Sequence, residues 1–238
     1  MAYRPRVVDA ELADHLSASG AVVIEGPRAC GKTSTAREVA SSEVLLDVDE
    51  SARQAIAVDP ALVLDGATPR LFDEWQIEPA IWNHIRRAVD LRAKPGQFIL
   101  TGSAVPADDI TRHTGAGRLA RLHMRPMSLF ETGHATGSTS LRGLLDGSVP
   151  RSPDPGLTVG DLAERVAVGG WPGLLDRDVR QSLQAVRAYL DEVRRVDLGR
   201  VDDRRRDPDR VGRFLRSLAR NVATHAAAPT LAAAAGGE

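Results

Sequence analysis

Residues 26–33 read Gly26-Pro27-Arg28-Ala29-Cys30-Gly31-Lys32-Thr33 and match the phosphate-loop pattern G-x-x-x-x-G-K-[ST]. The apolar run Ala21–Ile24 precedes them, and Thr33–Ala40, a segment with few helix breakers, follows. A strand that ends where such a loop begins lets backbone N–H groups wrap phosphates, and the following helix directs its positive end at them. This order of strand, loop and helix predicts that the chain binds a nucleoside triphosphate with Mg²⁺.

The residue types within the loop suit different parts of that task. We expect Lys32 to reach the β- and γ-phosphates and the Thr33 hydroxyl to hold Mg²⁺. Glycine at positions 26 and 31 permits backbone angles that other residues avoid. The residues predicted to contact the nucleotide are Gly26, Pro27, Arg28, Ala29, Cys30, Gly31, Lys32, Thr33 and Ser34.

The composition of the chain excludes several classes of protein. The chain has 238 residues and a formal net charge of −1, so we expect one large or two smaller domains and no global field that steers it to nucleic acid or membrane. No stretch approaches the ~20 consecutive apolar residues of a membrane span. No apolar segment follows Met1–Val8, so we expect no signal peptide. We therefore expect a cytoplasmic protein without a membrane partner.

Cys30 is the only cysteine, which rules out an intramolecular disulfide and fits a reducing cytosol. Redox control through Cys30 is conceivable, because helix N-termini lower the pKa of a thiol. We favour the simpler interpretation, in which Cys30 fills a variable loop position.

Short apolar runs alternate with helical patterns along the first half of the chain. After Ala21–Ile24 these runs are Val44–Leu46, Leu71–Phe72, Phe98–Leu100 and Arg118–Met124. A helix is predicted over Ile77–Leu91, where apolar residues recur every four positions. The pattern predicts an α/β fold, a mostly parallel sheet flanked by helices, with ligands at the carboxyl ends of the strands.

The character of the sequence changes after about residue 135. The segment Gly133–Pro155 is rich in Gly, Ser, Thr and Pro and is typical of a linker. Two amphipathic helices come after it, one over Val179–Val193 and one over Val211–Val222. We therefore predict a P-loop core over 1–135, a linker over 136–160, and a small helical C-terminal segment over 161–238 that opens an incomplete domain.

Polar residues end two further strands of the predicted sheet. Asp73 and Glu74 follow a short apolar run about 40 residues after Lys32 and fit a Walker B strand end. An aspartate there holds Mg²⁺ through water, and Glu74 can polarise the attacking water as a general base. Thr101 and Ser103 end the next apolar run, where additional-strand ATPases place a polar residue that orients water near the γ-phosphate. A simple strand-to-loop turn is the alternative.

Arginine far outnumbers lysine in the sequence, so an ordinary surface residue is the alternative interpretation for each arginine to which we give a role. Arg118 could stabilise transferred charge across a subunit interface, which leaves a homo-oligomer open. The arginine-rich stretch Arg194–Arg220 could contact DNA. A solvated helical hairpin of mixed charge fits it better, because only Tyr189 and Phe214 lie nearby for base stacking.

Several segments together resemble a known family, the prokaryotic AAA-type ATP-binding proteins. These are relatives of the archaeal ATPase group that pair an N-terminal ATPase core with a C-terminal domain of unknown function. The matching segments keep the family's order over roughly residues 5–220: Gly26–Thr33, Phe72–Gln76, Leu100–Ser103, Gly117–Arg118, Arg125–Glu131 and Gly169–Pro172. The resemblance implies an AAA-like P-loop NTPase fold of the additional-strand class. It also implies a C-terminal domain longer than the segment after Gly169, so we expect this chain to be truncated.

These observations lead us to expect an AAA-like protein that binds ATP with Mg²⁺ and hydrolyses it to ADP and phosphate. ATP is preferred over GTP because the guanine-reading Asn-Lys-x-Asp motif does not appear. One alternative is a P-loop small-molecule kinase, although Asp73-Glu74 suits water activation better. The other is a slow or non-hydrolysing nucleotide-dependent switch, or DNA-binding adaptor, that contacts DNA through its C-terminal region.

Overall fold

The computed structural model of the protein describes residues 2–102, 114–149, 151, 153–197, 207–234 and 236. The chain forms two compact units, residues 1–179 and residues 180–238. The regular elements of the first unit are α1 (Val8–Ala18), β1 (Ala21–Glu25), α2 (Lys32–Arg37), β2 (Ser42–Leu45), α3 (Glu50–Val58), a 3-10 helix (Pro60–Val63), β3 (Arg70–Asp73), a 3-10 helix (Trp75–Ile77), α4 (Ile81–Arg92), β4 (Phe98–Gly102), β5 (Leu119–His123), α5 (Leu141–Leu145), α6 (Val159–Val168) and a 3-10 helix (Pro172–Leu174).

The described strands form one five-stranded sheet in the order β2-β3-β4-β1-β5, and every neighbouring pair is parallel. Strand β4 therefore lies between β1, which leads into the phosphate loop, and β3, which ends at Asp73. All the carboxyl ends meet at one edge of a parallel sheet, so the phosphate loop, Asp73 and Thr101 lie at the same edge. The α/β fold with an additional strand between β1 and β3 is confirmed.

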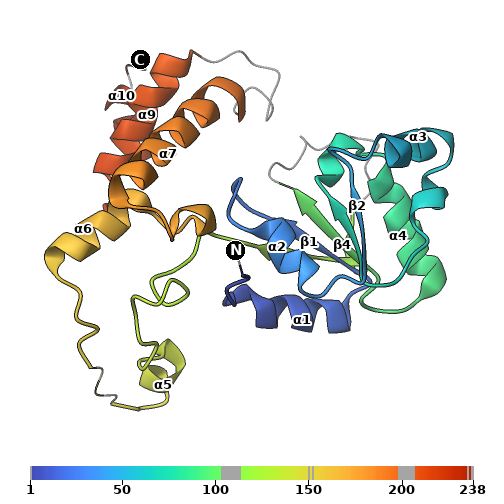
Figure 1. The fold of residues 1–238 in the computed structure, drawn as a ribbon, viewed down its shortest axis with the longest axis horizontal. Helices are drawn as coiled ribbons and strands as arrows, with labels where there is room; N and C mark the ends of the chain where they lie inside the picture. The colour runs from blue at the N-terminus through green and yellow to red at the C-terminus, as the bar shows by residue number, and fades with distance from the viewer. Residues whose placement is uncertain are drawn as a thin grey trace. The chain divides into compact units, whose positions relative to one another are not determined.

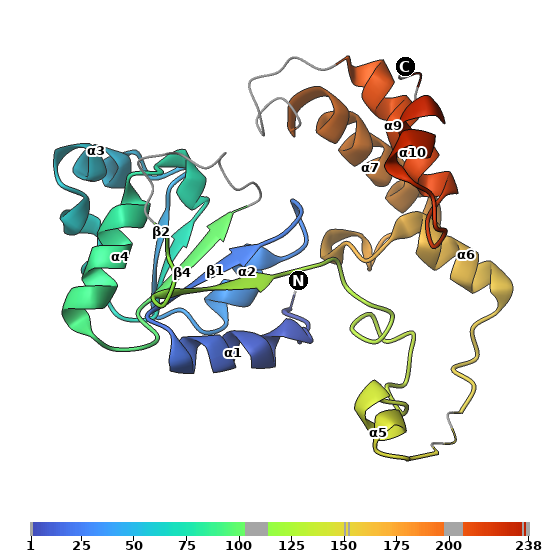
Figure 2. The ribbon, with the colours of Figure 1, turned by 180° about the vertical axis from the view of Figure 1, so that it is seen from behind.

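Helices cover both faces of this sheet (Figures 1 and 2). Strand β1 is apolar except at its last residue because both of its faces are buried. Val22 and Ile24 pack with residues of α1 and α2, whereas Val23 packs with residues of α3 and α4. The two resulting layers of apolar side chains hold β1 in the sheet, so the phosphate loop that follows β1 is held in a fixed position.

Helix α4 begins later than the sequence pattern predicts. The expected helix over Ile77–Leu91 starts at Ile81, and Ile77 lies in a 3-10 turn with 42% of its surface exposed. The reason is Pro79, because the residue before a proline avoids the helical region. Glu78 accordingly adopts φ −124° and ψ 73°. Ile81, Ile85 and Val89, which continue the spacing of four, are buried as predicted.

Other boundaries also differ from the expectations. The helix after the phosphate loop ends at Arg37, so Glu38–Ala40 lie outside it. The apolar patterns do not predict helix α3, whose start is marked by the Asp49 side chain, which accepts a hydrogen bond from the Ala52 N–H. The predicted linker limits of 136–160 stay a prediction. Within them the structure forms the short helix α5 and the start of α6.

The second unit is helical. Its elements are α7 (Val179–Glu192, which begins at the unit boundary), a π-helical turn (Val193–Asp197), α9 (Pro208–Arg220) and α10 (Ala228–Ala234). Both predicted C-terminal helices are confirmed, while α10 is not among the predicted elements although alanine is the strongest helix former. Among the helices that the structure describes, none has the length and apolar character needed to cross a membrane.

The buried core of the sheet makes a stability prediction. Leu100 in β4 is fully buried, whereas Leu91 at the end of α4 is 86% exposed. We expect Leu100→Ala to lower the free energy of unfolding by about 2–5 kcal/mol, because it removes apolar contacts and leaves a cavity. Leu91→Ala should change it by less than about 0.5 kcal/mol. Urea titrations followed by the fluorescence of buried Trp75 and Trp82 measure both values, and equal losses would contradict the assigned core.

Candidate functional site

The phosphate loop connects β1 to α2 through two glycines that other residues cannot replace. A Cβ atom on Gly26 would lie 2.2 Å from the carbonyl oxygen of Met124, and Gly26 has φ +157°. Gly31 adopts φ +104° immediately before α2. Both positions therefore require glycine for steric or conformational reasons, as the motif predicts.

Lys32 joins the two ends of the loop. Its Nζ donates to the carbonyl oxygens of Gly26 and Pro27, at 3.0 Å each. The side chain is almost fully buried, with 6% of the residue exposed. These bonds hold the ammonium group against the inner rim of the loop, where the sequence predicts that it meets phosphate oxygens.

Asp73 is hydrogen-bonded to two other predicted site residues. Its Oδ1 accepts a hydrogen bond of 2.8 Å from the Thr33 hydroxyl and another from the Thr101 hydroxyl. Asp73 and Thr101 are register partners in β3 and β4, and Thr33 comes from α2. Asp73 is 8% exposed and Thr101 is fully buried. The hydroxyl and carboxylate oxygens at positions 33 and 73 are hard donors of the kind that Mg²⁺ prefers, so this donor pair fits that metal.

Glu74 is held in an unusual conformation beside this cluster. Its backbone is left-handed, with φ +53° and ψ +45°, which costs a non-glycine residue on the order of 1 kcal/mol. Its Oε2 accepts a hydrogen bond from the Gln76 side chain. Among the described side chains, Gln76 Oε1 is buried without a hydrogen-bond partner. The strained backbone and the Gln76 amide together fix the Glu74 carboxylate.

The sequence motifs assign no task to Gln76. Its side chain also lies against the end of β4, because a Cβ atom on Gly102 would come within 2.5 Å of Gln76 Oε1. The one signal that could have identified Gln76 is its place two residues after Glu74, in a segment that the family resemblance includes.

The other two predicted catalytic positions are Ser103 and Arg118. Ser103 lies outside the described residues. The Arg118 carbonyl accepts from the Ala21 N–H at the start of β1, so Arg118 lies at the opposite edge of the sheet from the loop. Its guanidinium pairs with Asp90 of α4 at 2.6 Å. A role of Arg118 at the site of a second copy stays a prediction.

A pocket of about 290 Å³ borders the phosphate loop at Gly31. Its wall combines the N-terminal segment, the loop, α2 and the residue after it, the segment after β5, and the segment after α6: Ala2, Tyr3, Arg4, Arg6, Gly31, Ser34, Arg37, Glu38, Met127, Pro172 and Leu175. The Tyr3 hydroxyl donates to Asp9 at 2.6 Å and lies 3.0 Å from the Thr35 hydroxyl, which anchors the N-terminal segment over α2. Residues 2–6 carry no motif, so no sequence pattern indicates this contact.

Cys30 is fully buried within the loop. Burial raises the pKa of its thiol, although the nearby charges of Lys32 and Arg6 act in the opposite direction. A buried thiol with a raised pKa is a poor nucleophile. The geometry therefore supports the interpretation without redox control.

The Asp73 cluster predicts a stability difference between two substitutions at one position. Thr101→Val keeps the shape of the side chain but removes the hydroxyl that donates to a buried carboxylate. We expect it to lower the free energy of unfolding by about 1–3 kcal/mol. Thr101→Ser keeps the donor and should cost less. Urea titration of both variants by tryptophan fluorescence tests this order. Equal stability of Thr101→Val and the wild type would contradict the assigned hydrogen bond.

Two families of protein domains match this chain. Residues 18–133 match the AAA domain family, and residues 159–238 match a domain of unknown function (DUF8612). The first match contains β1, the phosphate loop, Asp73 and Thr101, which are the parts that form the site. The resemblance inferred from the sequence motifs is therefore confirmed for both regions.

Individual proteins are also similar to this chain, at 30% sequence identity or less. The uncharacterized proteins Mb2031c of Mycobacterium bovis and Rv2008c of Mycobacterium tuberculosis are each 30% identical over 135 residues, which cover 55% of this chain and 30% of the mycobacterial protein. The chain thus spans about a third of the length of these relatives. The Walker-type ATPase PABY2304 of Pyrococcus abyssi is 16% identical, with a TM-score of 0.43 over 95% of this chain and 86% of that protein. By these matches, residues 18–133 of this chain are similar to the AAA domain family, and residues 159–238 are similar to a domain family of unknown function.

Proposed function

We propose that this protein binds ATP with Mg²⁺ at the phosphate loop and hydrolyses it to ADP and phosphate. The observation that carries the proposal is the cluster in which Thr33, Asp73 and Thr101 meet beside the loop. A phosphate loop alone is common to binding proteins and enzymes. A carboxylate held next to the loop threonine, with a second carboxylate one residue further on, supports hydrolysis.

The roles follow from the positions of the side chains. Backbone N–H groups of the loop and the Lys32 ammonium bind the phosphates, and phosphate oxygens take over the place that the Gly26 and Pro27 carbonyls hold against Lys32. Thr33 and Asp73 hold Mg²⁺, which when bound neutralises charge on the phosphate oxygens. Thr101 keeps Asp73 oriented through its hydrogen bond.

Glu74 acts as the general base in this proposal. It follows Asp73 directly, so it lies at the same carboxyl edge of the sheet as the loop, and the Gln76 amide restricts its rotation. A carboxylate in this place can accept a proton from a water that attacks the γ-phosphate. The predicted contact of Thr101 or Ser103 with that water stays a prediction.

The adenine base fits the pocket beside Gly31 and Ser34. Its volume of about 290 Å³ is close to that of small ligand sites. Tyr3, Pro172 and Leu175 line it with flat or apolar surface, which suits a planar base. Since the pocket borders the loop directly, one ligand can occupy both.

Phosphate release tests the proposal. The wild type should release phosphate from ATP in a Mg²⁺-dependent reaction, and more slowly or not at all from GTP. Lys32→Ala should abolish ATP binding, because the ammonium that meets the phosphates is lost. Glu74→Gln should still bind ATP but release phosphate about 10²–10⁴-fold more slowly, since the base is lost and the shape is kept. Glu11→Gln on α1, an exposed carboxylate away from the loop, is the matched control and should behave as the wild type.

Three outcomes separate the alternatives. Unchanged hydrolysis in Glu74→Gln would remove Glu74 as the base. ATP binding without phosphate release by the wild type would favour the nucleotide-dependent switch. Transfer of phosphate to an added acceptor, without release of free phosphate, would favour the kinase.

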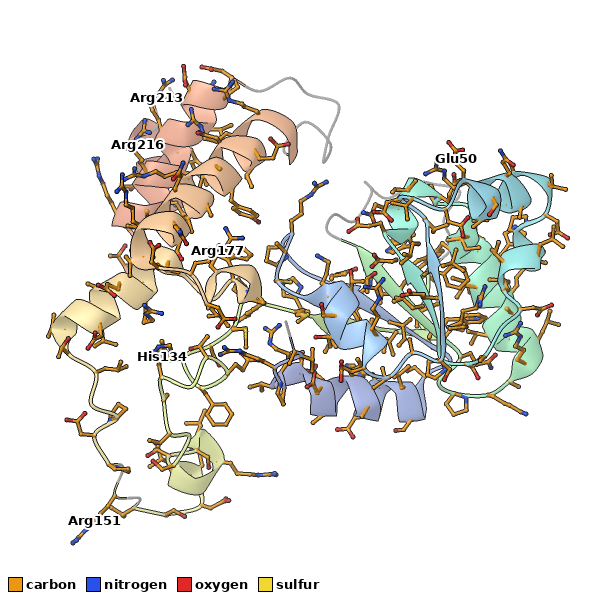
Figure 3. The ribbon with its side chains drawn as sticks, in the orientation of Figure 1. Glu50, His134, Arg151, Arg177, Arg213 and Arg216 are labelled. Carbon is orange, nitrogen blue, oxygen red and sulfur yellow. The ribbon has the colours of Figure 1, made fainter. Side chains whose placement is uncertain are left out.

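A second candidate function, binding of duplex DNA by the second unit, rests on one feature of α9. Arg210, Arg213, Arg216 and Arg220 are all exposed. They are spaced by three or four residues and so share one face of the helix. Figure 3 shows Arg213 and Arg216 projecting from the same side of α9. A row of exposed guanidinium groups on one helix face suits the phosphates of a nucleic-acid backbone.

Duplex binding at several salt concentrations tests this second function. The double variant Arg213→Gln/Arg216→Gln should bind a DNA duplex more weakly and reduce the slope of log K against log salt concentration by about 2, one unit for each lost phosphate contact. Arg87→Gln/Arg142→Gln removes the same charge from exposed positions of the first unit and should leave the slope unchanged. Undetectable or salt-insensitive binding by the wild type would exclude DNA as a partner of α9.

A further inference from the structure

Arg6 is a buried arginine that the proposed function does not use. Only 8% of the residue is exposed. Its guanidinium makes three contacts with separate parts of the chain: Nε with Glu131 Oε1 at 2.9 Å, Nη1 with the Cys30 carbonyl at 2.8 Å, and Nη2 with the Arg125 carbonyl at 2.8 Å. The planar fork of a guanidinium suits such divergent contacts, which a single ammonium cannot make together.

The contact with Cys30 acts on the phosphate loop itself. The carbonyl of Cys30 and the N–H of Gly31 belong to one planar trans peptide, so they point in opposite directions. Because Arg6 holds the Cys30 carbonyl on the outer side of the loop, the Gly31 N–H is directed to the inner side. Gly31 has φ +104°, a conformation from which the peptide could otherwise rotate easily, because glycine is permissive.

Glu131 fixes the Arg6 guanidinium at Nε, away from the atom that contacts Cys30. Its carboxylate also accepts the backbone N–H of Val7 at 2.8 Å and that of Ser128 at 2.6 Å. Burial alone would raise the pKa of Glu131, but the bonds from Ser128, Val7 and Arg6 outweigh it and leave the pKa below its ordinary value. The carboxylate is therefore charged at neutral pH and pairs with the guanidinium. Both side chains of the pair are less than a tenth exposed.

The segment that carries Glu131 also contacts the loop directly. The Met124 carbonyl oxygen occupies the space that a Cβ atom of Gly26 would need. The Met127 N–H donates to the Gly170 carbonyl at 2.7 Å, and a Cβ atom on Gly170 would lie 1.9 Å from the Met127 carbonyl oxygen. Residues 124–131 thus form a support between the phosphate loop and the glycine pair at 169 and 170.

We propose that Arg6 is a positioning residue for nucleotide binding. The Arg6–Glu131 pair holds the Cys30–Gly31 peptide with its N–H directed at the phosphates of the bound nucleotide. This inference rests on the proposed ATP site and adds a residue that lies outside the phosphate-loop motif. Arg6 contacts neither the phosphates nor the metal, and it acts through the backbone of the loop.

Equilibrium binding of ATP and of pyrophosphate tests the role. Arg6→Lys should weaken the binding of both ligands at least tenfold, and by the same factor, in protein that is folded at the temperature used. Pyrophosphate is the informative probe because Arg6 also borders the pocket proposed for the base, and pyrophosphate carries no base. Glu131→Gln keeps the two hydrogen bonds from Arg6 to carbonyl oxygens but removes the charge that orients Arg6. It should therefore weaken the binding of both ligands by a smaller factor than Arg6→Lys does.

Arg92→Lys is the matched control. Arg92 also donates to a carbonyl oxygen, that of Leu64, and pairs with a carboxylate, Asp65. It ends α4, away from the phosphate loop. Arg92→Lys should lower the thermal unfolding temperature without changing either affinity by more than about twofold. Thermal unfolding of every variant shows which temperatures allow a comparison of folded proteins.

The outcomes separate this inference from the proposed function. If the wild type binds ATP and Lys32→Ala does not, while folded Arg6→Lys and Glu131→Gln bind as the wild type, the inference is overturned and the ATP site stands. A loss for ATP but not for pyrophosphate assigns Arg6 to the base pocket and also overturns it. If the wild type binds neither ligand, the proposed function fails and the inference fails with it.

Discussion

The buried carboxylate of Asp73 is the constraint on which the site depends. It lies at the end of β3 with 8% of the residue exposed, and two hydroxyl groups donate to it. A buried carboxylate without donors is costly, so Thr33 and Thr101 stabilise the place where β3 ends. The same bonds tie α2 to β3 across β4. The alignment of the phosphate loop with the other strand ends follows from the hydrogen-bonded Asp73 carboxylate together with the parallel register of the sheet.

A second layer of contacts surrounds the loop from outside. The N-terminal segment and residues 124–131 meet at the Arg6–Glu131 pair, and the Met124 carbonyl closes against Gly26. Removing one partner of a buried ion pair costs about 3–5 kcal/mol, because the other charge is left unpaired. The loop is therefore held from its inner side by Lys32 and from its outer side by Arg6. Such a pre-organised loop avoids part of the ordering cost of binding.

Much of this arrangement could be predicted from the sequence, for identifiable reasons. The phosphate loop and the strand ends at Asp73 and Thr101 are local patterns: a short apolar run followed by a polar residue of fixed type. Their convergence at one edge could be predicted because the carboxyl ends of parallel strands lie at the same edge of a sheet. The prediction for helix α4 is correct along most of its length. Its predicted start is wrong because the prediction follows the spacing of the apolar residues and does not take Pro79 into account.

The rest depends on contacts between residues far apart in the chain. Arg6 and Glu131 are separated by 125 positions, and neither stands in a pattern that indicates a partner. For Gln76 the sequence offers only its place two residues after Glu74, because its contact with the end of β4 appears only in the folded protein. Arg118 precedes a predicted strand, but only the register of β5 with β1 shows that it lies at the edge opposite the loop.

A crystal structure of the protein with Mg²⁺ and a non-hydrolysable ATP analogue tests the central claim most directly. Our account predicts the triphosphate within the phosphate loop, the γ-phosphate near Lys32, and the metal held at Thr33 and Asp73. It also predicts the Gly31 N–H directed at a phosphate oxygen while Arg6 retains the Cys30 carbonyl. A nucleotide bound elsewhere, or a metal that contacts neither Thr33 nor Asp73, would contradict it.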